Sequence, residues 1–227
     1  MTSSLQSTTK STTDPTLLDH IEGVQSISST YSTFLLDMWG VMHDGTKPYE
    51  GVLETVQQLK SQQKEMIILS NSSKRVDNAK RMLTKLGFDP ENDFAQIITS
   101  GDISHRMLCG DESLACSTWH ILSDLINQNK KKVFVFGSGD GDEEYCTSSG
   151  WTLSSIDEAN LIIARGTFTI NDGSGEVVTK NEGEEEYFRI LNETLEKAAS
   201  RNVPMLITNP DKVRPDKDLS PMPGSIG

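Results

Sequence analysis

Two short apolar runs in this sequence each end in residues that could attack or bind a phosphate group. The run at 34–36 ends at the carboxylate of Asp37, and the run at 66–69 ends at Ser70 and Asn71. Such runs are typical of buried parallel strands, whose carboxyl ends meet at one sheet edge where ligands bind. A carboxylate can act as a nucleophile, and hydroxyl and amide groups can donate to phosphate oxygens. We therefore predict that Asp37 and Ser70 share one crevice, the alternative for Asp37 being a simple turn former.

Glycines and a later apolar run should complete this crevice. Gly40 lets the backbone after Asp37 turn tightly and come close to a ligand. The run at 203–207 ends near Asn209 and Asp211, which we expect to face the same crevice. A simple Pro-Asp turn is the alternative for that last segment.

The patterns at 37–45, 69–72 and 207–211 resemble motifs of the haloacid dehalogenase (HAD) superfamily of hydrolases, and look like those of its class IIA subfamily. The resemblance spans about residues 30–215. It implies an α/β fold, with a HAD-like, Rossmann-like three-layer core around a parallel sheet and an inserted α/β cap of the C2 type. It also implies a Mg²⁺-dependent phosphatase that acts on a small phosphorylated metabolite through an aspartyl-phosphate intermediate.

The resemblance also assigns roles to residues of the predicted crevice. Asp37 would be the nucleophile, and its carboxylate would bind Mg²⁺ together with the backbone carbonyl of Trp39. Ser70 would donate a catalytic hydrogen bond to the phosphate. The predicted substrate-binding residues are Gly40, Asn71 and Asn209.

Trp39 departs from the family pattern in a way that affects the chemistry. Most HAD phosphatases have a second Asp at this position, acting as general acid and base, but the indole N–H of Trp39 is only a donor. His43 and Asp44 lie close by and are alternative groups for proton transfer. We favour the interpretation that both are ordinary loop residues.

A second departure concerns the segment after Asp211. In the superfamily a lysine motif and a pair of acids follow the cap, whereas Lys212 and Lys217 come too early and lie in a Pro- and Asp-rich stretch. The sequence therefore reads as a HAD hydrolase without its final third, which should leave sheet surface exposed and catalysis weak. The alternative function is a catalytically incompetent chain or pseudoenzyme that at most binds phosphorylated ligands.

Composition narrows the possible partners. The net charge of -12 disfavours binding to nucleic acid or to an anionic membrane surface, because both rest on cationic contacts. No apolar run approaches the ~20 residues of a membrane helix. The three cysteines lack metal-site spacing and suit a reducing compartment. We expect a cytoplasmic protein, with homo-oligomerisation left open and with organelle targeting by the Ser/Thr-rich residues 1–15 as the alternative.

Composition and periodicity also divide the chain. We predict a disordered tail at 1–15, a core at 16–100 and 203–227, and a cap domain at 101–202. Helices are predicted at 48–63, 76–86, 103–108, 114–126 and 181–200, and further strands at 95–98, 131–136 and 161–164.

Two charged segments have ordinary explanations. The stretch 137–144 lacks both a dinucleotide fingerprint and the spacing of a Ca²⁺ loop, so we predict an exposed acidic loop. This disfavours a nucleotide-binding Rossmann domain as a third functional class. Lys74 and Arg75 could meet a substrate phosphate, although solvated charges at a helix start are commoner.

Overall fold

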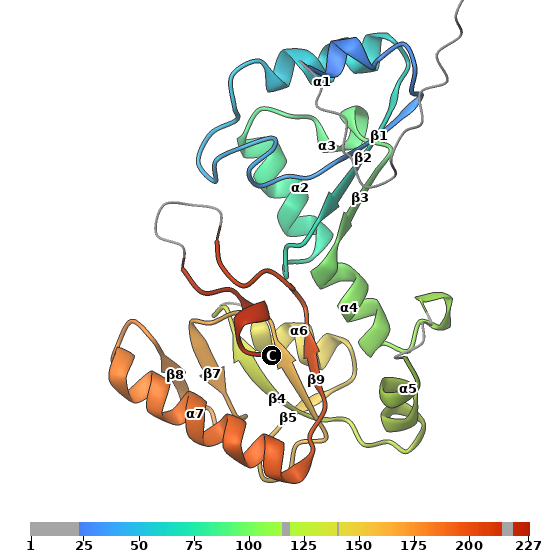
Figure 1. Ribbon diagram of the computed structural model, residues 1–227. Helices are drawn as coiled ribbons and strands as arrows, with labels where there is room; N and C mark the ends of the chain where they lie inside the picture. Colours follow the sequence, from blue (N-terminus) through green and yellow to red (C-terminus); the bar gives the residue numbers. More distant parts are fainter. Residues whose placement is uncertain (1–22, 115–118, 140, 215–219) are drawn as a thin grey trace, which may run out of the picture.

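The computed structural model describes residues 23–114, 119–139, 141–214 and 220–227. It has two α/β units joined by helix α4 (Ser100–Leu108) (Figure 1). The first unit comprises residues 24–99, and the second comprises residues 119–214 with 220–227. The predicted tail at 1–15 lies outside the described residues. Within them, we find no helix with the length and apolar character needed to cross a membrane.

The first unit contains the sheet that carries Asp37 and Ser70. Its strands are parallel, in the order β1-β2-β3, so their carboxyl ends meet at one edge as predicted. Leu36 pairs with Ile68, and Ser70 pairs with Thr99. The elements are β1 (Thr33–Leu36), α1 (Val52–Ser61), β2 (Glu65–Ser70), α2 (Val76–Lys85), α3 (Pro90–Asp93) and β3 (Gln96–Thr99), after a short 3-10 turn, η1 (Val24–Ser26).

Alternate residues of these strands face opposite sides of the sheet. One side is buried against α1 and α2, in a cluster that includes Met66, Ile68 and Leu83. On the opposite side, Leu35 is 66% exposed and Leu69 is 50% exposed. Parallel sheets are normally covered on both faces. The described residues therefore cover one face of this sheet and leave apolar side chains open on the other.

The second unit is built on a six-stranded sheet. The strand order is β8-β7-β4-β6-β9, with β5 paired to β4, and β7 runs antiparallel to both of its neighbours. The side chains of β4 alternate between two clusters, one shared with α5 and α6 and the other shared with α7. The elements are η2 (Glu112–Leu114), α5 (Trp119–Asn127), β4 (Lys132–Gly137), α6 (Asp142–Ser148), β5 (Thr152–Leu153), β6 (Leu161–Ala164), β7 (Thr169–Asn171), β8 (Val177–Thr179), α7 (Glu184–Arg201), β9 (Met205–Ile207) and η3 (Pro223–Ser225).

Strand β9 corrects the prediction that residues 203–227 share the core sheet with residues 16–100. Ile162 pairs with Met205, so β9 extends the second sheet instead. Helix α7 packs on that sheet and ends at Asn202, which adopts a left-handed conformation. Only a short connection follows, so the chain returns beside β6, whose four residues are all buried and need a hydrogen-bonding neighbour.

The predicted start of the helix at 48–63 also differs from the structure. Pro48 was expected in the first turn of a helix, but it pairs with His43, and α1 begins later, at Val52. Helix α2 begins at Val76, as predicted, and its N-cap Arg75 makes no side-chain cap bond. The hydroxyl of Ser73 donates to the carbonyl of Arg165 in the second unit, at 2.7 Å.

The prediction of an exposed acidic loop at 137–144 is wrong in part, because Gly137 ends β4 and residues 142–144 form the first turn of α6. Asp142 begins α6 and is only 3% exposed, whereas Glu143 and Glu144 are exposed as expected. A buried carboxylate needs a counter-charge. Arg165, which is equally buried, provides it, and a loop prediction from composition could not find this distant partner.

Helix α4 makes a close junction between the units. Thr99 caps it by accepting from the backbone N–H of Asp102. A Cβ atom on Gly101 would lie 2.1 Å from the carbonyl oxygen of Ser73, so only glycine fits there. Tyr145 donates its hydroxyl to the carbonyl of Gly101 at 2.7 Å, and His105 Nε2 lies 2.9 Å from Ser148 Oγ.

We predict that the exposed face of the first sheet contributes little to stability. Leu83→Ala, at a fully buried position, should lower the free energy of unfolding by about 2–5 kcal/mol. Leu69→Ala, at a half-exposed position, should lower it by less than about 1 kcal/mol. Urea unfolding of both variants tests this. Equal losses would mean that something covers Leu69 in solution.

The buried imidazole of His105 should make stability depend on pH. Burial lowers its pKa, and the charge of Arg75 lowers it further. The unfolded chain, with a His pKa near ~6.5, then binds more protons than the folded chain at slightly acidic pH. Stability should therefore fall as the pH drops below about 6.5 and through the folded pKa. In urea titrations between pH 5 and 7, His105→Gln should flatten this slope, and an unchanged slope would refute the assignment.

Candidate functional site

The two units face each other across a crevice with a cavity of about 600 Å³. The carboxyl ends of β1 and β2 line one side, and the carboxyl ends of β4, β6 and β9 line the other. The structure thus brings together most of the predicted site residues. The lining residues are Asp37, Trp39, Ser70, Asn71, Ser72, Ser73 and Lys74 from the first unit, and Ser138, Arg165, Gly166, Thr167, Phe168, Asn209, Asp211, Val213, Arg214, Met222 and Pro223 from the second.

Asp37 is held in place by its own loop. Its Oδ1 accepts the backbone N–H of Met38 at 2.8 Å, and its side chain is otherwise exposed toward the crevice. Met38 and Met42 are buried in the core of the first unit and anchor the loop. Gly40 has a φ of 88°, which permits the sharp turn between them. Gly40 itself does not line the cavity, so its substrate-binding role remains a prediction.

Trp39 forms an apolar wall of the crevice. Its ring stacks on the buried imidazole of His43 and lies beneath the guanidinium of Arg214, 4.9 Å from Cζ. Its backbone carbonyl accepts no hydrogen bond from the described backbone groups. Trp39 can therefore shape the site and offer a carbonyl ligand, but its side chain cannot transfer a proton.

His43 and Asp44 are used by the loop itself, which supports the ordinary interpretation. His43 is 2% exposed, its Nδ1 accepts the N–H of Gly45, and burial lowers its pKa. Asp44 accepts the N–H groups of Thr46 and Lys47, which lower its pKa to about 2. Neither residue lines the crevice.

The segment after β2 contacts the second unit directly. Ser70 is 8% exposed, and its Oγ accepts the N–H of Ser72. Asn71 donates its amide to Asp211 Oδ1 at 3.1 Å. Asn209 is buried, and its Oδ1 accepts the N–H of Asp211 at 2.8 Å. The predicted residues at the end of β9 therefore meet the end of β2, although β9 belongs to the other sheet.

Arg165 is a crevice residue that the sequence prediction missed. It directly follows the buried strand β6, and this is the same strand-end signal that identified Asp37. Its Nη1 lies 2.5 Å from Asp142 Oδ1, and its guanidinium covers the ring of Tyr145 at 3.8 Å. Its carbonyl accepts the hydroxyl of Ser73, so a buried ion pair in the second unit supports the segment after Ser70.

Residues near the end of the chain complete the crevice wall. Thr167 donates its hydroxyl to the carbonyl of Pro221 at 2.8 Å, and the N–H of Met222 donates to the carbonyl of Lys212. A Cβ atom on Gly224 would lie 2.0 Å from the carbonyl oxygen of Pro210, so this segment packs closely.

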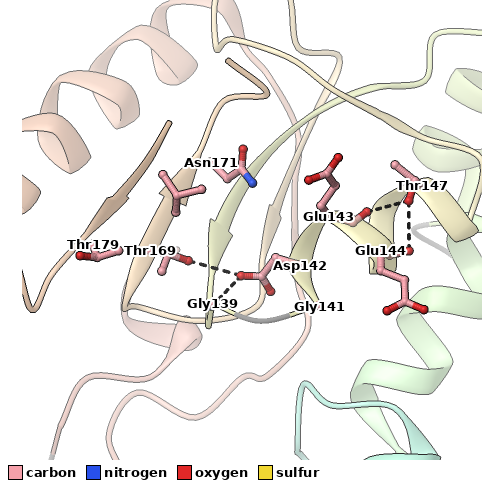
Figure 2. Close-up of a pocket in the computed structure, with 10 residues that line it drawn as sticks. Gly139, Gly141, Asp142, Glu143, Glu144, Thr147, Thr169, Asn171 and Thr179 are labelled. Carbon is pink, nitrogen blue, oxygen red and sulfur yellow. Dashed lines mark hydrogen bonds between the residues drawn. The ribbon is translucent and has the colours of Figure 1, made fainter. Parts of the chain in front are cut away.

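A larger cavity, of about 690 Å³, lies within the second unit, away from Asp37 and Ser70 (Figure 2). Asp142 accepts hydrogen bonds there from Thr169 and from the backbone of Gly139. Its other lining residues are Gly141, Glu143, Glu144, Thr147, Asn171, Val177 and Thr179. Its carboxylates would repel a phosphate group. We therefore place the candidate site in the smaller crevice, where the reactive groups converge.

We predict that Arg165 and Asp142 depend on each other for stability. Arg165→Met should cost about 3–5 kcal/mol, because it leaves the Asp142 charge buried and unpaired. The double variant Arg165→Met with Asp142→Leu should cost less than the single Arg165→Met change, because no unpaired charge remains. Urea unfolding measures both values. A double variant that is as unstable as the sum of the two single variants would refute this coupling.

Comparisons with known proteins agree with this arrangement. The chain matches the family described as haloacid dehalogenase-like hydrolase over residues 34–152, more than half of its length. Comparison with curated proteins gives no significant match.

Three solved structures have a similar fold. A haloacid dehalogenase-like hydrolase from Brucella suis 1330 has 22% identity and a TM-score of 0.64, over 91% of this chain and 65% of that chain. A possible sugar phosphatase of the HAD superfamily from Cytophaga hutchinsonii has 19% identity and a TM-score of 0.60, over 91% and 65%. A 4-nitrophenylphosphatase from Thermotoga maritima has 21% identity and a TM-score of 0.55, over 88% and 63%.

These likenesses concern the fold, and the chain spans less than two thirds of the length of each of these structures. They confirm the predicted α/β architecture, with a Rossmann-like core and a second unit. Together with the family match, which covers the strand ends at Asp37 and Ser70, they lead to one conclusion. The chain belongs to the haloacid dehalogenase-like hydrolases.

Proposed function

We propose that the crevice hydrolyses phosphate esters of small metabolites, with Asp37 as the nucleophile. The observation that carries this proposal is the meeting of Asp37, Ser70 and Lys74 around one cavity, at the carboxyl ends of parallel strands. A carboxylate, a hydroxyl and an ammonium group there can respectively attack, orient and neutralise a phosphate group.

The proposed reaction has two steps. A carboxylate oxygen of Asp37 bonds to phosphorus, the ester P–O bond breaks, and the leaving oxygen takes a proton from water. Water then attacks the aspartyl-phosphate, releasing phosphate and restoring Asp37. Ser70 and Asn71 donate hydrogen bonds to the phosphate oxygens, and the second unit limits access of bulk water.

A Mg²⁺ ion fits the oxygen donors of this site. The Asp37 carboxylate and the Trp39 carbonyl are hard oxygen ligands, and Mg²⁺ commonly uses one or two carboxylates with phosphate oxygens and waters. The described residues contain no cluster of three or more His, Cys, Asp or Glu side chains that could hold a metal alone. When bound, the ion would reduce the repulsion between the carboxylate and the phosphate.

A second candidate function is binding of phosphorylated ligands without turnover. Trp39 favours it, because it fills the position of the usual proton-transfer Asp, and His43 and Asp44 are engaged within the loop. An intact phosphate-binding strand end without a general acid could hold a phosphate ester but would hydrolyse it slowly.

Assays with Mg²⁺ and a panel of phosphorylated metabolites, together with 4-nitrophenyl phosphate, test the proposal. We expect Asp37→Asn to abolish hydrolysis, and Ser70→Ala to lower the rate by about 10²–10³. Asp44→Asn is the matched control, because Asp44 lies on the same loop outside the crevice, and it should change the rate by less than about threefold.

The outcomes separate the two functions. If hydrolysis continues in the Asp37→Asn variant, Asp37 is not the nucleophile. Calorimetric binding of a phosphate ester that depends on Ser70, without hydrolysis, would favour the binding protein instead. We also propose, from the sparse cysteines and the metabolite class, that the protein works in the cytoplasm.

A further inference from the structure

A third cavity, of about 430 Å³, lies between α2 of the first unit and α6 of the second. Its lining residues are Lys74, Arg75, Asp77, Asn78, Arg81, Gly141, Glu144, Tyr145, Ser148 and Arg165. Lys74 and Arg165 also line the catalytic crevice, so the two cavities lie on either side of these side chains. We propose that this third cavity binds a phosphate group, either as a free anion or as part of a larger metabolite.

The charges around the cavity support an anionic ligand. The chain has 21 Lys and Arg against 33 Asp and Glu, yet four cations meet at this one place. The side chain of Arg81 has no hydrogen bond or ion pair among the described residues. Arg75 pairs with Asp102 through Nε alone, which leaves its two Nη groups available. Guanidinium groups of this kind bind phosphate oxygens in pairs of parallel hydrogen bonds.

Carboxylates oppose this attraction. Asp77 and Glu144 also line the cavity, and Asp102 and Asp142 neutralise part of the charge of Arg75 and Arg165. Binding must therefore rest on directed hydrogen bonds as well as on net charge. Removing an exposed carboxylate such as Glu144 should then strengthen phosphate binding. This gives a second test, in which the affinity is expected to rise and not to fall.

The start of α2 adds backbone donors to the cavity. The start of α2, a helix of ten residues, lies at the cavity wall, which is lined by Lys74, Arg75 and Asn78. The N-cap residue Arg75 makes no side-chain cap bond. The N–H groups of Val76 and Asp77 donate to no described acceptor. Unsatisfied N–H groups at a helix start favour a bound anion.

Arg165 gives an independent indication of a missing acceptor. It is 3% exposed, and its Nε has no hydrogen-bond partner among the described residues. Buried donors without an acceptor are rare and costly in folded proteins. The Arg165 side chain lines the cavity, so a phosphate group bound there would lie beside a guanidinium whose donors are not all satisfied.

The site would connect the two units. Arg75 and Arg81 come from the first unit, whereas Arg165 and α6 come from the second. A phosphate group held by both would favour the observed arrangement of the units. Lys74 lines both cavities, but Asp37 and Ser70 do not line this one, so the proposal does not require that the crevice hydrolyses phosphate esters.

Calorimetric titration with inorganic phosphate at constant ionic strength tests the site. Arg81→Gln should weaken binding about tenfold, because it removes charge-assisted hydrogen bonds, while Arg81 is exposed enough for the fold to survive. Glu144→Gln should tighten binding. Lys130→Gln, which removes an exposed cation elsewhere, is the control for net charge and should leave the affinity unchanged.

A second ligand distinguishes the two sources of the phosphate group. If the site holds a free anion, Arg81→Gln weakens the binding of inorganic phosphate. If it holds one end of a metabolite, Arg81→Gln weakens the binding of propane-1,3-diyl bisphosphate more than it weakens the binding of inorganic phosphate. The proposal is wrong if neither Arg81→Gln nor Glu144→Gln changes the affinity for inorganic phosphate or for the bisphosphate. It is equally wrong if only Ser70→Ala abolishes binding, because the phosphate would then bind in the other crevice. If Asp37→Asn leaves hydrolysis unchanged, Asp37 is not the nucleophile, but the proposal of a phosphate site in the third cavity is unaffected.

Discussion

The buried pair of Arg165 and Asp142 supports the wall of the crevice that faces the first unit, and several other features of the structure follow from it. With side chains 3% and 4% exposed, neither charge is solvated by water, so each is tolerated only beside the other. The pair is also connected outward. Asp142 fixes the turn at Gly139, and the backbone of Arg165 accepts the hydroxyl of Ser73. The segment that should bind phosphate is therefore positioned by charges that lie in a different sheet.

The sequence predicts the first half of the crevice well, because that half is encoded locally. A short apolar run followed by Asp37 or Ser70 specifies both the strand and the position of the polar residue at its end. Parallel pairing of β1 and β2 then brings these residues to the same edge. Helices α1 and α2 follow from the spacing of apolar residues: α2 begins at the predicted residue, whereas α1 begins later than predicted, at Val52.

The second half depends on pairings that composition does not reveal. The apolar pattern of β9 predicts a strand, but not whether β2 or β6 will be near it, since that depends on where α7 packs. Likewise, Asp142 stands in an acidic stretch that looks solvated, and its burial follows from Arg165, which is distant in sequence. Ser73 could cap a helix locally, but it bonds across the crevice instead.

The absence of a side chain at Gly101 has a mechanical meaning. The backbone of the first turn of α4 touches Ser73 so closely that this contact is the natural pivot between the units. From Gly101, α4 extends about 10 Å to Leu108, whose carbonyl accepts the indole N–H of Trp151. A rotation of about 10° around Gly101 would move Leu108, at the far end of α4, by about 2 Å, which is enough to separate hydrogen-bonded atoms. Because α4 is one rigid helix, such a swing carries Trp151 and the sheet packed around it as a single body.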